Sequence, residues 1–597
     1  MAHLSEHSNK LAIKEKIVSE HQALIRYTRD FTDVCVLRLP ACKPQEYGQR
    51  LDGVGQVVAE AAANLGAEAT LVILGEVPDL VAIHPNVSPF VQYQSWIAIK
   101  RTPPVFSRDS SALPHHHFGA LVYTRYKSSL RHTKTRIGYT FCPACDKTTK
   151  DYGGKKHTYH EYGTLISDVW RDLACDFSGD LTAIFDRFAD FFGIDEYKEL
   201  RVIDCRSLPL KRLAVKPSAS SLQSASTTPL PTKWNDKLVS GDCLEQLRQI
   251  PDNSVDFAFA DPPYNLGKDY NGYSDDLAIT EYFDWCDKWI AELARVLKPG
   301  RTCAILNIPL WAIRHFLFME TILNFQNWIA WDALSFPVRL LMPSHYAILC
   351  FSKGTSRPVP GFSKEIIQPG FATIPPPQIF LSPLAEGYCL RAQCIAYRKA
   401  ARSDDRASLT DIWWDVHRLK HNTRRVDHPC QLPPQLMYRL IALFTEPKEV
   451  VLDCFNGAGT TTLAAHQLGR KYIGIEQEET YHKLTESRHN EIVYGLDPFR
   501  KAERTLTAKN SPVPRLPKQK YEVPKKTLQL EVKRVAKSIK KIPNRDEMIR
   551  YGKYPIQYYD LYFTSWGEVC AAARTTGMTE NRVAKAETEV KQRSFFD

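Results

Sequence analysis

The sequence predicts an α/β protein, and three observations support this prediction. Strand-like and helix-like hydrophobic patterns alternate through the middle of the chain. A glycine-containing loop, residues 455–460, follows an apolar strand and opens a helix. The next strand ends in an acidic residue, Glu476, which lies 19 residues after Gly457. In a doubly wound sheet this spacing suits a carboxylate that binds the ribose hydroxyls of a nucleoside cofactor.

Two segments with few large apolar residues divide the chain. Residues 207–234 are rich in Ser, Thr and Pro, and residues 501–526 are rich in Lys and Pro. At 597 residues the chain is too long for one hydrophobic core. We therefore expect an N-terminal module (1–206), a central module (235–500) and a small helical C-terminal module (527–597), joined by these two linkers.

The central module contains well-defined hydrophobic runs. A helix that starts at Glu281 is predicted to stop at Lys298-Pro299-Gly300, because proline and glycine terminate helices. The predicted elements are a strand at 255–260, a helix at 281–297, strands at 302–308 and 450–454, a helix at 461–468 and a strand at 471–476.

The N-terminal module repeats features of the central module in the same order. The matching pairs are Phe31–Val36 with Ser254–Phe259, Glu46-Tyr47 with Glu281-Tyr282, Trp96–Ala98 with Trp328–Ala330, His117-Phe118 with His345-Tyr346, and Asp168–Asp172 with Asp411–Asp415. In this register Arg38-Leu39-Pro40-Ala41 takes the place of Asp261-Pro262-Pro263-Tyr264, and the glycine loop has no counterpart. The N-terminal module is therefore expected to be a degenerate α/β half-copy with neither a catalytic group nor a cofactor site.

Asp261-Pro262-Pro263-Tyr264 follows the predicted strand at 255–260 and suits methyl transfer to an amino group. The amino group of a base is a poor nucleophile, because its lone pair is delocalised into the ring. An enzyme must accept hydrogen bonds from both amino hydrogens and hold the nitrogen in line with a sulfonium methyl group. The Asp261 carboxylate and the Pro262 carbonyl can accept these bonds, and the two prolines stiffen the turn. Tyr264 can stack on a base that has rotated out of the duplex.

Two long segments of the central module resemble the β-group amino methyltransferases of DNA. KLVSGDCLEQLRQIPDNSVDFAFADPPYNLG is similar to the opening of that family through its catalytic motif. DHPCQLPPQLMYRLIALFTEPKEVVLDCFNGAGTTTLAAHQLGRKYIGIEQ is similar to its cofactor half. The resemblance implies a Rossmann-like, circularly permuted fold that binds S-adenosyl-L-methionine (SAM), and it places target recognition at about 354–410. The chain departs from the family at Leu432, where the family often has Lys.

The resemblance also assigns roles to individual residues. Glu476 would bind the ribose of SAM, Asp242 would lie beside its adenine, and His428-Pro429 would lie near its methionine end. The remaining residues of the implied SAM site are Asp453, Phe455, Asn456, Gly457, Ala458, Gly459 and Thr460.

The family resemblance predicts double-stranded DNA as the substrate, in a restriction-modification or phage-defence setting with restriction or defence proteins as possible partners. Adenine is preferred over cytosine, because adenine members of the family usually begin the motif with Asp and many cytosine-N4 members use Ser. Two alternatives stay open: a cytosine-N4 methyltransferase, and a non-catalytic DNA-binding protein that recruits a partner nuclease.

The cysteines offer two candidate zinc sites. Cys142 and Cys145 form a C-x2-C pair, and Cys389 and Cys394 form a C-x4-C pair at the matching place of the other repeat. These four could provide tetrahedral ligands if the two modules dock with pseudo-twofold symmetry as an internal pseudodimer. The alternative ligand set replaces the second pair by His157 and His160. Buried thiols without metal, and a homodimer in place of the pseudodimer, are the other interpretations.

Charge is concentrated at the end of the chain. Residues 501–597 contain 21 Lys or Arg and 11 Asp or Glu, which accounts for nearly all of the net charge of +11. Residues 552–578 resemble the small helical repeats appended to some homing endonucleases, which bind DNA. Both observations favour contact with DNA phosphates over a solvated tail.

The remaining composition argues against membrane insertion and secretion. No N-terminal apolar stretch resembles a signal peptide, and charged residues interrupt the most apolar stretch, 302–331. Fifteen cysteines without a secretory signal indicate a reducing compartment. We expect a cytoplasmic, nucleoid-associated protein.

Overall fold

The computed structural model divides the chain into two compact units, Met1–Lys501 and Ala502–Asp597. The residues that the structure describes are 13–17, 33–42, 46, 49–106, 111–127, 130–152, 160, 162–194, 198–208, 210–214, 226–266, 269–270, 273–274, 276–333, 344–359, 389, 391–401, 408–416, 426, 431–499, 523–563 and 565–573.

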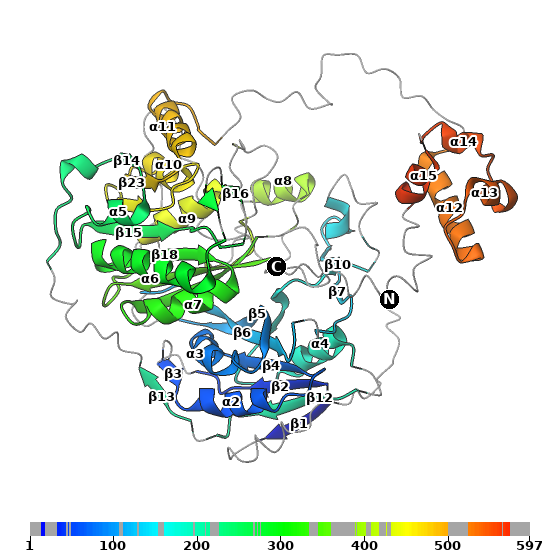
Figure 1. Ribbon diagram of the computed structural model, residues 1–597, viewed down its shortest axis with the longest axis horizontal. Helices are drawn as coiled ribbons and strands as arrows, with labels where there is room; N and C mark the ends of the chain where they lie inside the picture. Colours follow the sequence, from blue (N-terminus) through cyan, green and yellow to red (C-terminus); the bar gives the residue numbers. More distant parts are fainter. Residues whose placement is uncertain are drawn as a thin grey trace. The chain divides into compact units, whose positions relative to one another are not determined.

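The N-terminal part of the first unit is a seven-stranded mixed sheet in the order β1-β12-β2-β4-β6-β5-β11 (Figure 1). Its strands are β1 (Ile13–Ile17), β2 (Val34–Arg38), β4 (Thr70–Gly75), β5 (Gln92–Val105), β6 (His115–Thr124), β11 (Val169–Cys175) and β12 (Leu200–Asp204). Its helices are α2 (Val54–Ala63), α3 (Val77–Val87) and α4 (Thr182–Phe192). The shorter elements are β3 (Gln49–Leu51), β7 (Arg136–Ile137), β8 (Phe141–Cys142), β9 (Lys147–Thr148), η2 (Thr149–Tyr152), β10 (Thr164–Leu165) and β13 (Arg212–Ala214).

The central part is an eight-stranded sheet in the order β14-β23-β22-β15-β18-β20-β19-β21. Its strands are β14 (Lys237–Ser240), β15 (Val255–Ala260), β18 (Leu297–Asn307), β19 (Asn324–Asp332), β20 (His345–Ser352), β21 (Ile412–Trp413), β22 (Val450–Asp453) and β23 (Lys471–Glu476). Its helices are α5 (Cys243–Leu247), α6 (Ile279–Val296), α7 (Pro309–Met319), α8 (Ala392–Ala401), α9 (Pro434–Phe444), α10 (Thr460–Gln467) and α11 (Glu479–Val493). The shorter elements are η5 (Thr232–Trp234), β16 (Asp269–Tyr270) and β17 (Tyr273–Ser274).

Local sequence explains where these elements begin and end. β15 and β22 are buried along their whole length and read as continuous apolar runs, as parallel strands covered on both faces do. Helix α6 ends at Val296, directly before the predicted Lys-Pro-Gly stop, and the chain continues as β18 with Gly300 at φ 74°. The six predicted elements all occur, with the main difference that β18 starts at Leu297 instead of Thr302.

Over seven strands the two sheets have the same arrangement and the same polarity of every pairing, except that β1 comes first in its half of the chain and its counterpart β23 comes last. The central sheet adds only β14 at one edge. Both sheets also carry a register irregularity at the same place, between Tyr93 and Ser95 in β5 and between Phe325 and Asn327 in β19. The repeat read from the sequence therefore coincides with strand register, so that equivalent residues occupy equivalent positions in the two sheets.

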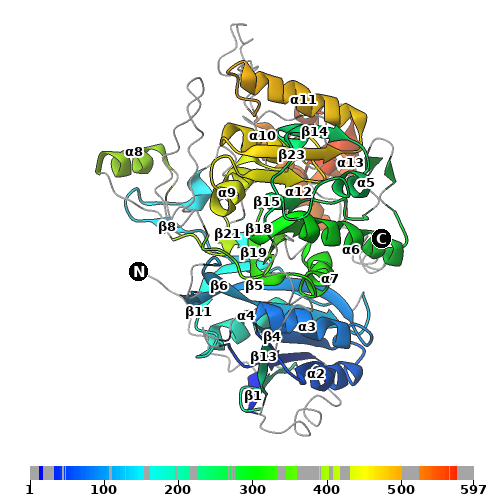
Figure 2. The same ribbon diagram turned by 90° about the vertical axis from the view of Figure 1, so that its left-hand side faces the viewer.

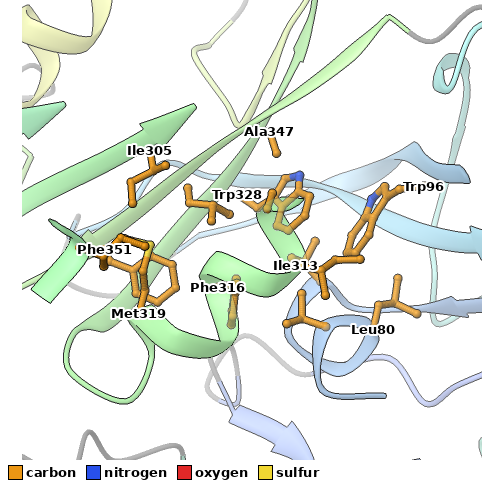
Figure 3. Packing of buried hydrophobic residues seen from close by; sticks show 14 of the residues in the cluster. Leu80, Trp96, Ile305, Ile313, Phe316, Met319, Trp328, Ala347 and Phe351 are labelled. Atoms are coloured by element: carbon orange, nitrogen blue, oxygen red, sulfur yellow. The ribbon is translucent and has the colours of Figure 1, made fainter. Parts of the chain in front are cut away.

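Equivalent residues also meet where the two sheets pack together. Trp96 of β5 and Trp328 of β19 stack with ring centroids 4.4 Å apart and an interplanar angle of 13°. Both are buried, and Figure 3 shows them with Ile313 of α7 and Leu80 of α3 nearby. A residue that stacks on its own counterpart is typical of an isologous contact.

Two buried aspartates extend this reciprocal contact. Asp168 of the N-terminal part accepts hydrogen bonds from the backbone N–H groups of Ser344 and His345, both at 3.0 Å. Its counterpart Asp411 accepts a hydrogen bond of 2.8 Å from the backbone N–H of His116 in the N-terminal part. Each half thus supplies an equivalent aspartate acceptor to the other half. These bonds satisfy buried backbone N–H groups, which would destabilise the fold if they had no partner.

The segment expected to be the first linker, 207–234, is partly structured. β13 pairs antiparallel with β3, and Arg212 of β13 forms an ion pair of 2.8 Å with the buried Asp79 of α3. The Trp234 side chain is buried in the core. The N-terminal module therefore extends at least to Ala214. The low content of large apolar residues did not predict the strand β13, because polar contacts hold this strand in place.

The second unit is a small helical domain. Its helices are α12 (Lys525–Ile539), α13 (Arg545–Tyr551), α14 (Gln557–Asp560) and α15 (Trp566–Ala572). They enclose a core that includes Leu528, Met548, Tyr559 and Phe563. Asn544 and Glu547 form a capping box at the start of α13, which stabilises this short helix.

Within the described residues, no helix is both long enough and apolar enough to cross a membrane.

Candidate active site

The expected catalytic motif and the glycine loop emerge from neighbouring parallel strands. β15 pairs with β22 through Phe259 and Asp453, and β22 pairs with β23. β23 pairs in turn with β14, where Ser240 lies opposite Glu476. The segments that follow these four strands therefore lie together beyond the carboxyl ends of the strands. This is the place where ligands bind in open α/β sheets.

The Asp261–Tyr264 turn is held by side chains from two helices. The Tyr282 hydroxyl of α6 donates to the Pro263 carbonyl at 2.8 Å, and Trp311 Nε1 of α7 donates to the Tyr264 carbonyl at 2.8 Å. The described residues offer no such donor to the Pro262 carbonyl. The turn is thus rigid on either side of Pro262, and this carbonyl is available as an acceptor.

Tyr264 contacts Asp261 within the turn. Its side chain is only 8% exposed, and its hydroxyl donates to Asp261 Oδ1 at 2.8 Å. In this state it orients the carboxylate, and stacking on a base would require the ring to move. Tyr282 and Trp311 were not singled out as site residues from the sequence, although Tyr282 belongs to one of the repeat pairs. Their contacts with the turn arise from helices that follow it in the chain.

The glycine loop passes too close to α11 for larger residues. Gly457 and Gly459 have φ angles of 48° and 79°. A Cβ atom at Gly459 would lie 2.4 Å from Thr485 Cγ2 of α11. Asn456 is buried and accepts a hydrogen bond of 3.0 Å from the Thr462 hydroxyl. The loop thus has a fixed shape that leaves its backbone unobstructed by its own side chains, as a close-fitting ligand requires.

Two carboxylates flank the loop. Asp453 ends β22 and accepts a hydrogen bond of 2.9 Å from Phe455 N–H, and burial raises its pKa to about 7. Glu476 ends β23 and accepts hydrogen bonds from Gly457 N–H at 2.6 Å and from Glu478 N–H at 2.9 Å. Burial raises the pKa of Glu476, and these backbone donors oppose the effect. A positively charged or hydroxyl-rich ligand at this place would relieve the cost of desolvating both groups.

An aromatic wall closes one side of the loop. Phe455 meets Trp289 edge to face with centroids 5.2 Å apart, and it meets Trp285 at 5.6 Å. Both tryptophans belong to α6, the helix that also supplies Tyr282. A single helix therefore supports both the Asp261–Tyr264 turn and the glycine loop.

The other expected cofactor residues are placed as follows. Asp242 caps helix α5, with its Oδ1 accepting from Leu244 N–H at 2.9 Å and Glu245 N–H at 3.1 Å. These bonds place the Asp242 carboxylate at the start of the helix that follows β14, and Ser240 of β14 lies opposite Glu476. Ala458 and Thr460 are buried where the loop enters α10, whereas His428 and Pro429 lie outside the described residues.

The corresponding edge of the N-terminal sheet has a different composition. Arg38 occupies the register position of Asp261, is only 2% exposed, and donates to the Phe177 carbonyl at 2.7 Å. Val202 stands where Asp453 stands in the central sheet. A buried cation and an apolar side chain therefore replace Asp261 and Asp453. The acidic residue that ends β12, Asp204, lies beside Arg38 and forms ion pairs with Arg38 at 3.7 Å and with Arg206 at 2.6 Å.

The four cysteines of the first candidate metal set come together. The Sγ atoms of Cys142, Cys145, Cys389 and Cys394 all lie within 4.8 Å of one another. The alternative set finds less support: His160 Nδ1 instead accepts a hydrogen bond from Tyr162 N–H at 3.2 Å, and His157 lies outside the described residues.

The central part of the chain is similar to known proteins. Residues 255–487 match the model of the N6/N4 DNA methylase family. The type II methyltransferase M.BamHI of Bacillus amyloliquefaciens is 36% identical over 244 residues, which are 40% of this chain and 54% of that protein. M.HpaI of Haemophilus parainfluenzae is 28% identical over 265 residues, which are 44% of this chain and 76% of that protein.

Among solved structures, TTHA0409 of Thermus thermophilus, complexed with S-adenosyl-L-methionine, is 23% identical with a TM-score of 0.29. It covers 43% of this chain and 96% of its own length. This chain spans about half the length of M.BamHI, at 54%. Over about 40% of the chain, the central part therefore resembles the N6/N4 amino DNA methyltransferases.

Proposed function

We propose that the protein transfers a methyl group from SAM to the exocyclic amino group of adenine at specific sites in double-stranded DNA. The single observation that carries this proposal is the meeting of two chemically different turns at one sheet edge. An acidic Asp-Pro-Pro-Tyr turn follows β15, and a glycine loop with two flanking carboxylates follows the neighbouring strands β22 and β23. Homology over the same residues supports both assignments.

The proposed chemistry assigns separate tasks to the two turns. The Asp261 carboxylate and the Pro262 carbonyl accept hydrogen bonds from the two amino hydrogens of the target base, which localises the nitrogen lone pair. Tyr264 and Tyr282 hold the turn and limit its motion. Rigid acceptors cost little reorganisation when the nitrogen becomes positive during methyl transfer.

The residues at the glycine loop fit SAM. Glu476 retains acceptor capacity for ribose hydroxyls, and the desolvated Asp453 favours a ligand that carries positive charge. Asp242, the loop residues 455–460 and His428-Pro429 complete the proposed site. When bound, SAM supplies the electrophilic sulfonium methyl group. The catalytic turn precedes the cofactor loop in the chain, which is the permuted order of the β group.

The other modules are proposed to have roles other than methyl transfer. The N-terminal module is a degenerate copy, supported by its matching strand register and by Arg38 in the place of Asp261. The C-terminal unit would contact phosphates, because residues 523–573 contain ten Lys or Arg and five Asp or Glu. The relatives suggest a restriction-modification setting, with a restriction or defence protein as a possible partner.

Methyl transfer to DNA from radiolabelled SAM tests the proposal. Asp261→Ala should abolish transfer and leave the affinity for SAM within about twofold, because this carboxylate acts on the base. Asp284→Asn, a matched control at an exposed carboxylate of α6, should transfer at the wild-type rate. Full activity of Asp261→Ala would refute the assigned mechanism.

The modified nucleoside then separates the alternatives. Digestion of the product and mass spectrometry should yield N6-methyladenine. N4-methylcytosine would identify a cytosine enzyme of the same family. SAM binding and DNA binding without any transfer, on DNA of varied sequence, would instead identify a DNA-binding pseudoenzyme that recruits a nuclease.

A further inference from the structure

A cluster of four cysteines lies away from the proposed methyl-transfer site, and it consists of Cys142, Cys145, Cys389 and Cys394. Cys142, Cys389 and Cys394 are buried, with exposures of 6%, 1% and 5%. None of the four forms a disulfide. The two cysteine pairs come together from positions more than 240 residues apart in the sequence. Hydrophobic packing does not require four thiols at one place, and four cysteines are a common ligand set of structural zinc sites.

The distances suit a tetrahedral metal. Zinc–sulfur bonds of about 2.3 Å place the sulfur atoms of a tetrahedral site roughly 3.8 Å apart. The Sγ atoms of Cys145 and Cys389 are 3.7 Å apart, and no pair in the cluster exceeds 4.8 Å. A disulfide requires about 2.05 Å, so the observed spacing favours a metal between the sulfurs over a bond between them.

The local structure on each side presents its cysteine pair from a compact turn. Cys142 ends β8 and Cys145 lies in the turn before β9, where Asp146 adopts a left-handed conformation with φ 50°. Cys394 lies in the first turn of helix α8, and Cys389 comes three residues before that helix. The positive end of a helix dipole stabilises thiolates, which are the form that binds metal.

The two pairs occupy equivalent places in the two halves. Cys142 and Cys145 lie between β6 and β11, and Cys389 and Cys394 lie between β20 and β21, which are the equivalent strands of the central sheet. Figure 2 shows β8 beside α8. Because equivalent residues meet at the Trp96–Trp328 contact, the insertions after equivalent strands are also expected to meet around the same pseudo-twofold axis.

We propose that the four cysteines bind one Zn²⁺ that links the N-terminal module to the central module. Each half supplies two ligands, so neither half can bind the metal tightly alone. The ion closes the four-coordinate site and leaves no open position, which makes its role structural and not catalytic.

The site also has a consequence for DNA recognition, and this part rests on the proposed function. Cys389 and Cys394 lie within residues 354–410, the segment proposed to read the target sequence. β21, which follows it, lies at the opposite edge of the central sheet from β14 and β23. The metal therefore anchors the recognition segment to the N-terminal module, and its loss should weaken specific DNA binding while sparing SAM binding.

Metal analysis of the purified full-length protein tests the site directly. Inductively coupled plasma mass spectrometry should find about one zinc per chain. Cys142→Ser and Cys389→Ser should each lower the zinc content at least fivefold, whereas Cys175→Ser, a half-buried cysteine outside the cluster, should leave it unchanged. Loss with Cys142→Ser but not with Cys389→Ser would overturn the shared site in favour of the local Cys/His set.

Measurements on the wild-type chain keep the proposal testable if these variants fail to fold. Titration with a mercurial should release one zinc as four thiols react. Replacement by Co²⁺ should produce the intense visible absorption of a tetrahedral thiolate site. Wild-type protein without bound metal, or with iron in its place, would overturn the assignment of zinc, as would a disulfide within the cluster.

Binding assays on metal-depleted protein test the consequence separately. The affinity for a specific DNA site should fall at least tenfold, the affinity for SAM should stay within about twofold, and added Zn²⁺ should restore DNA binding. Unchanged DNA binding would overturn the anchoring role and leave the metal site intact. Because metal content is measured without methyl transfer, failure of the proposed methyltransferase function would leave the zinc result readable.

Discussion

Replacing Asp453 by Asn should stabilise the protein and weaken the cofactor site at the same time. Asp453 is buried at the end of β22, and burial raises its pKa to about 7 from the ordinary value of 3.8. Asn keeps the side-chain size and an oxygen that can accept from Phe455 N–H. The substitution therefore removes mainly the charge.

The magnitude follows from the pKa. A carboxyl group with a raised pKa binds its proton more tightly in the folded state, so stability falls as pH rises between about 4 and 7. A difference of about three pKa units corresponds to about 4 kcal/mol at 1.36 kcal/mol per unit. Asp453→Asn lacks this loss. The free energy of unfolding of Asp453→Asn should exceed that of the wild type by up to about 4 kcal/mol above pH 7, and this difference should vanish toward pH 4.

Urea unfolding at pH 5, 6, 7 and 8, followed by tryptophan fluorescence, measures the difference between the two proteins. The gain of Asp453→Asn should rise with pH by up to about 1.4 kcal/mol per unit and level off above pH 7. Asp256→Asn is a control variant that should lower the free energy of unfolding instead of raising it. Its carboxylate pairs with Lys298 at 2.8 Å and Arg301 at 3.1 Å, so losing it should cost about 3 kcal/mol at pH 7.

Calorimetry with SAM then tests the function of Asp453. Removing a charged acceptor from the cofactor site should reduce affinity at least about tenfold. A flat stability difference across pH would refute the reasoning about desolvation. Unchanged SAM affinity would show that Asp453 serves the fold and not the cofactor.

The other predictions concern the interface, the loop and the C-terminal unit. Trp328→Ala should lower the free energy of unfolding by about 3–5 kcal/mol, and a double-mutant cycle with Trp96→Ala should show a coupling near 1 kcal/mol; additive effects would contradict stacking. Gly459→Ala should weaken SAM binding, because its φ of 79° strains a larger residue and its Cβ would meet Thr485; wild-type affinity would mean that the loop adapts freely. Removing residues 509–597 should flatten the log–log salt dependence of DNA binding by roughly three to six units at about 0.9 per phosphate, without changing the methylated sequence. Identical slopes would place this segment outside the DNA interface.

Several parts of the candidate site could be read from the sequence because each depends on local chemistry. The buried strand before Asp261 and the glycine loop before α10 are short segments whose residue types dictate their conformation. The supporting contacts could not be read in this way. Tyr282, Trp311 and Thr485 act through helices that follow these turns at distances set by packing. The strand β13 was also not predicted. An ion pair between Arg212 and Asp79 holds this strand in place, and its sequence shows no apolar pattern typical of a strand.

The sequence by itself determined the alternation of strands and helices, the place of the catalytic turn and the repeat between the two halves. These features depend on hydrophobic periodicity and on glycine and proline geometry, which act over a few residues. Only the tertiary structure decided which distant groups meet. It stacked Trp96 on Trp328, brought two cysteine pairs from separate modules within 4.8 Å, and filled the position equivalent to Asp261 with a buried arginine bonded to a carbonyl. Such contacts depend on how whole sheets pack against each other. This packing is determined by the burial of many side chains together, and no local sequence pattern predicts it.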